Sequence, residues 1–120
     1  MKNQKLLTSF IAAFQGIIFA VRSERNMRLH LAAAFVVVII SLILQVEKWE
    51  LMFVLAAVFL VLITEMINTA LERVVDLSTQ KYNHLAHAAK NVAAGAVLFA
   101  AIFAIAVAGL VFGDRLRVLW

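Results

Sequence analysis

The stretch that decides how this chain folds is EMINTALERVVD, residues 65–76. It follows directly on a long apolar run, residues 51–63, so we expect one helix to continue through both. At about 100° per residue, four polar side chains then fall within an arc of roughly 80° on one helix face. This polar stripe consists of Glu65, Asn68, Glu72 and Asp76. Glu72 and Asp76 alone would also fit a solvated helix end, but ionisable groups near the membrane interior are costly and indicate a functional site.

The composition places the chain among membrane proteins. Hydrophobic residues make up 65% of the 120 residues and charged residues only 15%, and a soluble fold of this size could not bury so much apolar surface. Without proline or an evident linker, residues 1–120 suit a single helical domain. The absence of cysteine excludes disulfides and thiolate chemistry. The net charge of +4 lies at the flanks of the apolar runs, which argues against a nucleic-acid partner.

The apolar pattern predicts an all-α membrane protein with three transmembrane helices and an N-terminal amphipathic surface helix. Residues 1–28 carry apolar side chains at helical spacing, interrupted by Lys5, Gln15 and Arg22. A secretory signal is the alternative there, but no convincing cleavage site follows. We expect the transmembrane helices over residues 29–46, 51–71 and 92–112, with a polar connection over residues 77–89.

The distribution of basic residues predicts the orientation. Three spans place residues 1–30 and 70–92 on the same side of the membrane, and eight of the eleven Lys and Arg side chains lie in those two segments. The positive-inside rule therefore predicts a cytoplasmic N-terminus in a multi-pass protein. The eight residues are Lys2, Lys5, Arg22, Arg25, Arg28, Arg73, Lys81 and Lys90.

The same side gathers groups that suit a metal and a phosphate. Glu24 precedes the first span and joins the acids of the polar stripe, and Mg²⁺ usually takes one or two carboxylates together with water and phosphate oxygens. Lys90 opens the third helix, just before its apolar span, where helix N-terminal amides also favour a phosphate. His84 and His87 form only a weak zinc pattern. The chain has no GxxxxGK[ST], GxGxxG or GxSxG motif, so a nucleotide site would differ from the standard soluble designs.

Residues 65–76 read E-x-x-N-[ST]-A-x-E-x-x-V-D, which resembles the signature of the prokaryotic diacylglycerol kinase and undecaprenol kinase family. Residues 23–30, SERNMRLH, are similar to the family's N-terminal motif. Residues 84–86, 88–90 and 93–97 (HLA, AAK and AAGAV) are similar to its third motif. The three motifs occur in order over nearly the whole chain. The ERN and AAGAV forms look closer to the undecaprenol kinase branch typical of Gram-positive bacteria.

The resemblance implies a homotrimeric lipid kinase of the bacterial cytoplasmic membrane, with active sites between subunits. Such an enzyme moves the γ-phosphate of MgATP to the primary hydroxyl of a membrane lipid, here undecaprenol in preference to diacylglycerol. By resemblance Glu65 is the general base, and Glu24 and Glu72 hold the metal. The implied nucleotide contacts are Glu24, Glu72, Asp76, Lys81, Tyr82, Asn83, Lys90, Asn91 and, by a loose alignment, Lys5. The supporting polar residues are Asn68, Asn26 and Arg28.

One position departs from the family pattern. Lys90-Asn91 stands where the family pattern has Lys-Asp, and asparagine lacks the charge that could orient Lys90. A catalytically degenerate family member is therefore one alternative to an active kinase. A small cation-binding transport subunit is another, because an acidic stripe in a membrane also suits ion passage. Lys90 favours the kinase, since an ion path gains little from a phosphate-binding cation.

Overall fold

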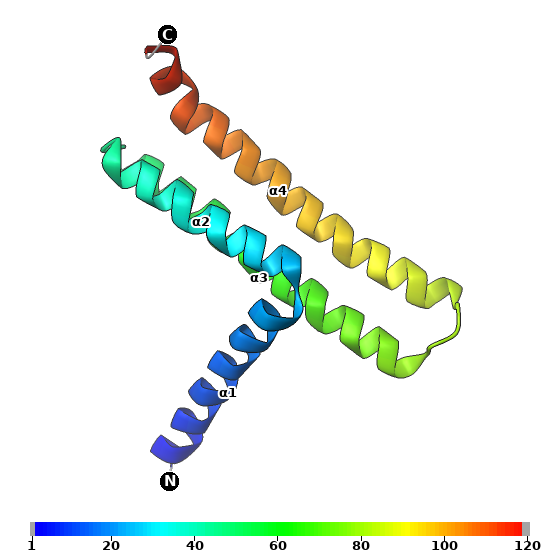
Figure 1. Ribbon diagram of the computed structural model, residues 1–120. Helices are drawn as coiled ribbons and strands as arrows, with labels where there is room; N and C mark the ends of the chain where they lie inside the picture. The colour runs from blue at the N-terminus through cyan, green and yellow to red at the C-terminus, as the bar shows by residue number, and fades with distance from the viewer. Residues whose placement is uncertain (1, 119–120) are drawn as a thin grey trace.

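A computed structural model describes residues 2–118 as four α-helices joined by short turns. The helices are α1 (Lys2–Ser23), α2 (Arg25–Ile43), α3 (Lys48–Ser78) and α4 (His84–Val118). The predicted all-α class is confirmed, and each of the four helices is long and apolar enough to cross a membrane. Figure 1 shows α2, α3 and α4 running alongside one another while α1 projects away from them. Because α3 packs against each of the other three helices, it is the centre of the fold.

The chain changes direction at Glu24, between α1 and α2. The backbone of Glu24 is extended, with φ −120° and ψ 118°. Nη1 of Arg28 then donates to the backbone oxygens of Val21 and Arg22 at 2.9 Å each, which gives partners to carbonyls at the end of α1. The helix expected over residues 1–28 therefore ends at Ser23. Residues 25–28 are charged or polar at three of four positions, yet they form the first turn of α2.

The turn after α2 is built around Gln45, which has a left-handed backbone with φ 53°. The N–H of Gln45 donates to the oxygen of Leu42, and the N–H of Val46 donates to the oxygen of Ser41, both at 3.2 Å. This is the Schellman pattern, which usually places glycine at the left-handed position. The span expected over residues 29–46 therefore includes the turn as well as the helix.

The next two helices extend beyond the expected spans. α3 has 31 residues, or about 46 Å at 1.5 Å per residue, and α4 has 35. Both are longer than the hydrocarbon thickness of about 30 Å, so in a membrane their ends would reach past it. The ranges 51–71 and 92–112 lie inside these helices, and the polar connection shortens to residues 79–83. Polar side chains at a helix end can reach water, so the backbone hydrogen bonding continues past the apolar run.

The apolar core lies between α3 and α4, toward the end of the bundle opposite the polar stripe. Next to it, Arg115 donates to both carboxylate oxygens of Glu50, each at 2.8 Å. These hydrogen bonds hold the pKa of the Glu50 carboxyl below its usual range. Most large apolar side chains elsewhere are exposed, as suits helices that face lipid. The buried core side chains are Val54, Ala57, Val107 and Val111.

Candidate active site

The four residues of the polar stripe all lie on α3, and their exposure increases along it. Glu65 is buried, at 5% exposure. Asn68 and Glu72 are half-buried, and Asp76 near the end of the helix is exposed. The stripe therefore connects a site inside the helix packing with the polar end of the bundle.

Glu65 meets α2 through a histidine. Its Oε1 atom lies 3.2 Å from Nε2 of His30. The Thr69 hydroxyl donates to the backbone oxygen of Glu65 at 3.0 Å, so Thr69 does not occupy the carboxylate. The motifs assign His30 no role beyond membership of the N-terminal motif, because its pairing with Glu65 depends on how α2 packs on α3.

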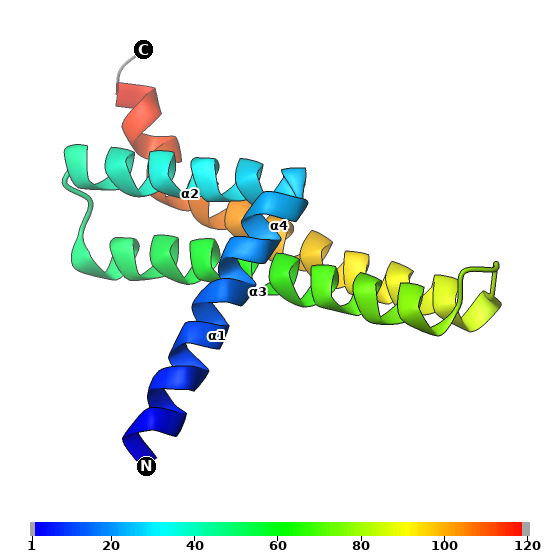
Figure 2. The same ribbon diagram turned by 60° about the horizontal axis from the view of Figure 1, so that its bottom comes forward.

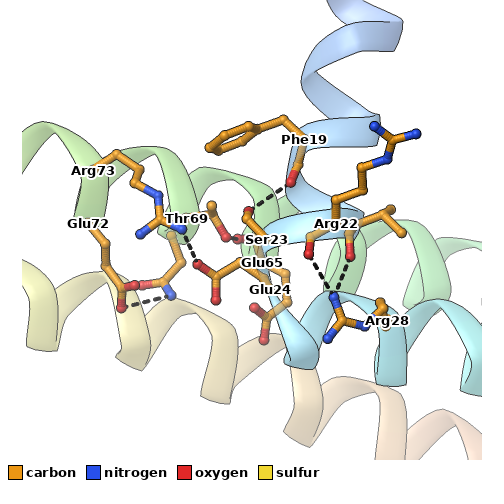
Figure 3. Close-up of polar contacts among 11 residues, drawn as sticks. Phe19, Arg22, Ser23, Glu24, Arg28, Glu65, Thr69, Glu72 and Arg73 are labelled. Atoms are coloured by element: carbon orange, nitrogen blue, oxygen red, sulfur yellow. Dashed lines mark hydrogen bonds and ion pairs between the residues drawn. The ribbon is translucent and has the colours of Figure 1, made fainter.

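Glu24 reaches α3 from the turn that precedes α2. Its Oε1 accepts a hydrogen bond from Nη2 of Arg73 at 3.0 Å. Figure 3 shows this contact beside Glu65 and Glu72, at the junction of α1, α2 and α3. The Arg73 guanidinium also lies 5.8 Å from the ring centroid of Phe19 on α1. Sequence reasoning missed Arg73 as a site residue, because eight residues after Glu65 it falls about 80° around the helix, beside the polar stripe and outside its arc.

Asn68 and Glu72 offer oxygen ligands for a cation. Nδ2 of Asn68 donates to Oε1 of Glu72 at 3.4 Å. Oδ1 of Asn68 is buried and has no hydrogen-bond partner within residues 2–118. A buried amide oxygen beside a carboxylate suits a hard cation such as Mg²⁺. Within the same residues no three His, Asp or Glu side chains are grouped closely enough to hold a metal, so further ligands would come from phosphate, water or another chain.

A pocket of about 460 Å³ lies where α3 ends and α4 begins. At its wall, Nζ of Lys90 lies 2.7 Å from Oδ1 of Asp76, which ties the first turns of α4 to the last turns of α3. The loop between the helices closes the other side, so an anion in the pocket would meet lysines from two directions. The predicted site residues that line the pocket are Asp76, Lys81, Tyr82, Asn83 and Lys90.

Asn83 has a structural task in that loop. Its Oδ1 accepts hydrogen bonds from the backbone N–H groups of Leu85 at 2.9 Å and Ala86 at 3.1 Å. It therefore caps the N-terminus of α4 and fixes the loop against the helix. Its amide nitrogen is the part of the side chain that is left to meet a ligand.

The other expected site residues lie outside these contacts. Asn91 is exposed, beside Lys90 but not on the pocket wall formed by the described residues. Lys5 lines a separate hollow on α1. Asn26 is exposed in the first turn of α2, and Arg28 binds the carbonyls of α1. A single chain thus brings Lys90 to the polar stripe but leaves Lys5 and Asn91 apart from it.

Comparison with known proteins decides the family. Residues 11–112 match the family described as prokaryotic diacylglycerol kinase. The chain belongs to that family. It is 43% identical over 105 residues to a diacylglycerol kinase of Synechocystis sp., a match that covers 87% of this chain and 60% of the relative.

Two further relatives of this member of the prokaryotic diacylglycerol kinase family are named after different lipids. An undecaprenol kinase of Bacillus subtilis is 38% identical over 114 residues, which cover 93% of this chain and 91% of the relative. A diacylglycerol kinase of Escherichia coli K12 is 32% identical over 93 residues, covering 78% and 76%. The resemblance read from the motifs is confirmed, and the prokaryotic family with its apolar helices makes this a bacterial membrane protein.

Proposed function

We propose that this protein is a lipid kinase that transfers the γ-phosphate of ATP to the primary hydroxyl of a membrane lipid. The observation that carries the proposal is the polar stripe of α3, which has a buried carboxylate, Glu65, at one end and the Asp76–Lys90 pair at the other. Phosphoryl transfer depends mainly on positioning and charge neutralisation. Membership of the prokaryotic diacylglycerol kinase family supports the same chemistry.

The two ends of the stripe have different roles in this proposal. Glu65 accepts the proton of the lipid hydroxyl as the hydroxyl oxygen attacks the γ-phosphorus and the bond to the β-phosphate oxygen breaks. Lys90 holds phosphate oxygens of ATP, and the loop over residues 79–83 encloses the nucleotide. Burial of Glu65 keeps bulk water away from the phosphoryl group, which favours transfer to the lipid over hydrolysis.

Mg²⁺ would be held by Glu24, Glu72 and the buried amide oxygen of Asn68, which has no hydrogen-bond partner among residues 2–118. When bound there with ATP, the ion would neutralise charge on the phosphates. Arg73 positions Glu24 toward α3 through the 3.0 Å contact.

We infer that α2, α3 and α4 span the membrane and that α1 lies along its surface. Figure 2 supports this, because α1 crosses the direction shared by the other three helices, as it does in Figure 1. With three spans, α1 and the loop over residues 79–83 share one side of the membrane. The excess of Lys and Arg on that side supports a cytoplasmic position, where ATP is present.

We also infer a homotrimer with active sites shared between subunits. Glu65 and Asp76 are eleven residues apart on one helix, or about 16 Å along its axis, and Lys90 pairs with Asp76. A phosphate held at Lys90 therefore lies far from a hydroxyl held at Glu65 of the same chain. Co-assembled E65Q and K90M subunits, assayed at an ATP concentration too low to support K90M alone, should recover part of the activity if a neighbouring chain supplies the missing residue. Failure of mixed oligomers to recover activity would contradict shared sites.

The lipid that accepts the phosphate remains to be assigned, and we propose undecaprenol. The Bacillus subtilis undecaprenol kinase aligns over almost its whole length, which supports this acceptor, whereas diacylglycerol kinase is the name of two other relatives. The test is to incubate purified protein in detergent with ATP, Mg²⁺ and undecaprenol, diacylglycerol or ceramide, and to measure phosphorylated lipid. E65Q should abolish product while ATP binding persists. Near-normal turnover by E65Q would refute the assignment of the base.

A further inference from the structure

We propose that His30 is a positioning residue for Glu65, holding the carboxylate in the orientation in which it accepts the lipid hydroxyl proton. The inference rests on the proposed lipid kinase function. It assigns a role to a side chain on α2 that the chemistry described above does not use.

The geometry isolates this pair. Nε2 of His30 and Oε1 of Glu65 are 3.2 Å apart, within reach of a hydrogen bond, and only 7% of the Glu65 side chain is exposed. Within residues 2–118, His30 is the basic side chain that lies within ion-pair distance of the Glu65 carboxylate. A catalytic hydrogen bond is often longer without substrate and shortens in the reacting complex.

The neighbouring charged groups are engaged elsewhere. On α2, Arg28 is bound to the carbonyls of α1. On α3, Arg73 is bound to Glu24. From α4, the residues that face the groove beside His30 are alanines and isoleucine, namely Ala104, Ile105 and Ala108. No second cation from the described residues competes for Glu65, so its orientation depends on the imidazole.

The surroundings make that contact effective. His30 lies at the edge of an apolar groove of about 230 Å³ between α2, α3 and α4. A polar contact beside such a groove is stronger than one in bulk water. An imidazole N–H on Oε1 would hold one carboxylate rotamer and leave Oε2 directed at the hydroxyl. A neutral imidazole does this without the full positive charge that would weaken the carboxylate as a base.

The kinetic test compares H30A with H30Q. The H30A variant removes the donor, and we expect kcat to fall about 10- to 100-fold while the KM for ATP stays within about twofold, because misplaced catalytic groups slow chemistry rather than binding. Glutamine keeps an N–H donor, so H30Q should recover most of the rate, which a merely space-filling role for His30 would not predict. H84A, which removes an exposed histidine from the first turn of α4, is the matched control and should retain the wild-type kcat.

A second readout does not need activity. In ¹⁵N-histidine-labelled protein, the His30 signal, assigned by its loss in H30Q, should show the neutral tautomer with the proton on Nε2. In E65Q that preference should weaken. An unchanged tautomer in E65Q, or wild-type kcat in H30A, would overturn the inference. An inactive wild-type protein would overturn the proposed function instead, while the tautomer would still report whether His30 and Glu65 interact.

Discussion

Replacing Lys90 with methionine should separate the stability of the fold from its ability to bind ATP. The K90M substitution keeps most of the side-chain length but removes the charge that lies 2.7 Å from Asp76. If Lys90 holds phosphate, the variant should fold normally and bind ATP weakly. If it serves only to join α4 to α3, the variant should lose stability instead.

The expected magnitudes follow from exposure. The Lys90 and Asp76 side chains are 38% and 55% exposed, so water screens their attraction. Loss of such an ion pair changes the free energy of unfolding by no more than about 1 kcal/mol. A hydrogen bond from a cation to a phosphate oxygen in a formed site contributes about 1.5–3 kcal/mol. The dissociation constant for ATP should therefore rise about 10- to 150-fold.

The assay measures both the dissociation constant for ATP in a binding experiment and the KM for ATP at saturating lipid. Both are needed because KM equals the dissociation constant only when chemistry is slow. The melting temperature in detergent is measured on the same samples. The control is K48M, which makes the same change at the opposite end of the bundle, at the start of α3. Unchanged ATP affinity in K90M together with a large fall in melting temperature would refute the phosphate-binding role.

Three further predictions follow from the same structure. E24A and E72A should each raise the Mg²⁺ concentration needed for half-maximal activity at least about tenfold, because each variant removes a proposed metal ligand that the site holds by a hydrogen bond. An unchanged Mg²⁺ requirement in both variants would show that the two carboxylates have a structural role only. Q45G should raise the melting temperature, since it removes a left-handed backbone cost of about 1 kcal/mol, whereas Q45A should not. Because Arg115 lowers the pKa of Glu50, the ion pair stabilises the folded state at pH values above the usual pKa of a glutamate. This stabilisation is lost as the pH falls through the lowered pKa of Glu50. Thermal melts below about pH 4 should therefore show a larger loss for wild type than for E50Q.

The sequence by itself determined the class of the protein and the location of its chemistry. An apolar run that continues into Glu65, Asn68, Glu72 and Asp76 specifies one helix with a polar face, because residues three, four, seven and eleven apart return to the same side. The ordered motifs then identified the family. These features are local or depend on order along the chain, so a reading of the sequence can reach them without knowledge of packing.

Only the tertiary structure decided which of those side chains meet. Glu24 and Arg73 are 49 residues apart in sequence, and Glu50 and Arg115 are 65 apart. Helix periodicity predicts neither of these pairings, nor the contact of His30 with Glu65. Each contact depends on the angle and depth at which two helices pack. The break at Glu24 is likewise set by Arg28 binding the end of α1. Helix periodicity fixes what lies on one helix face, but the packing of the helices determines what that face touches.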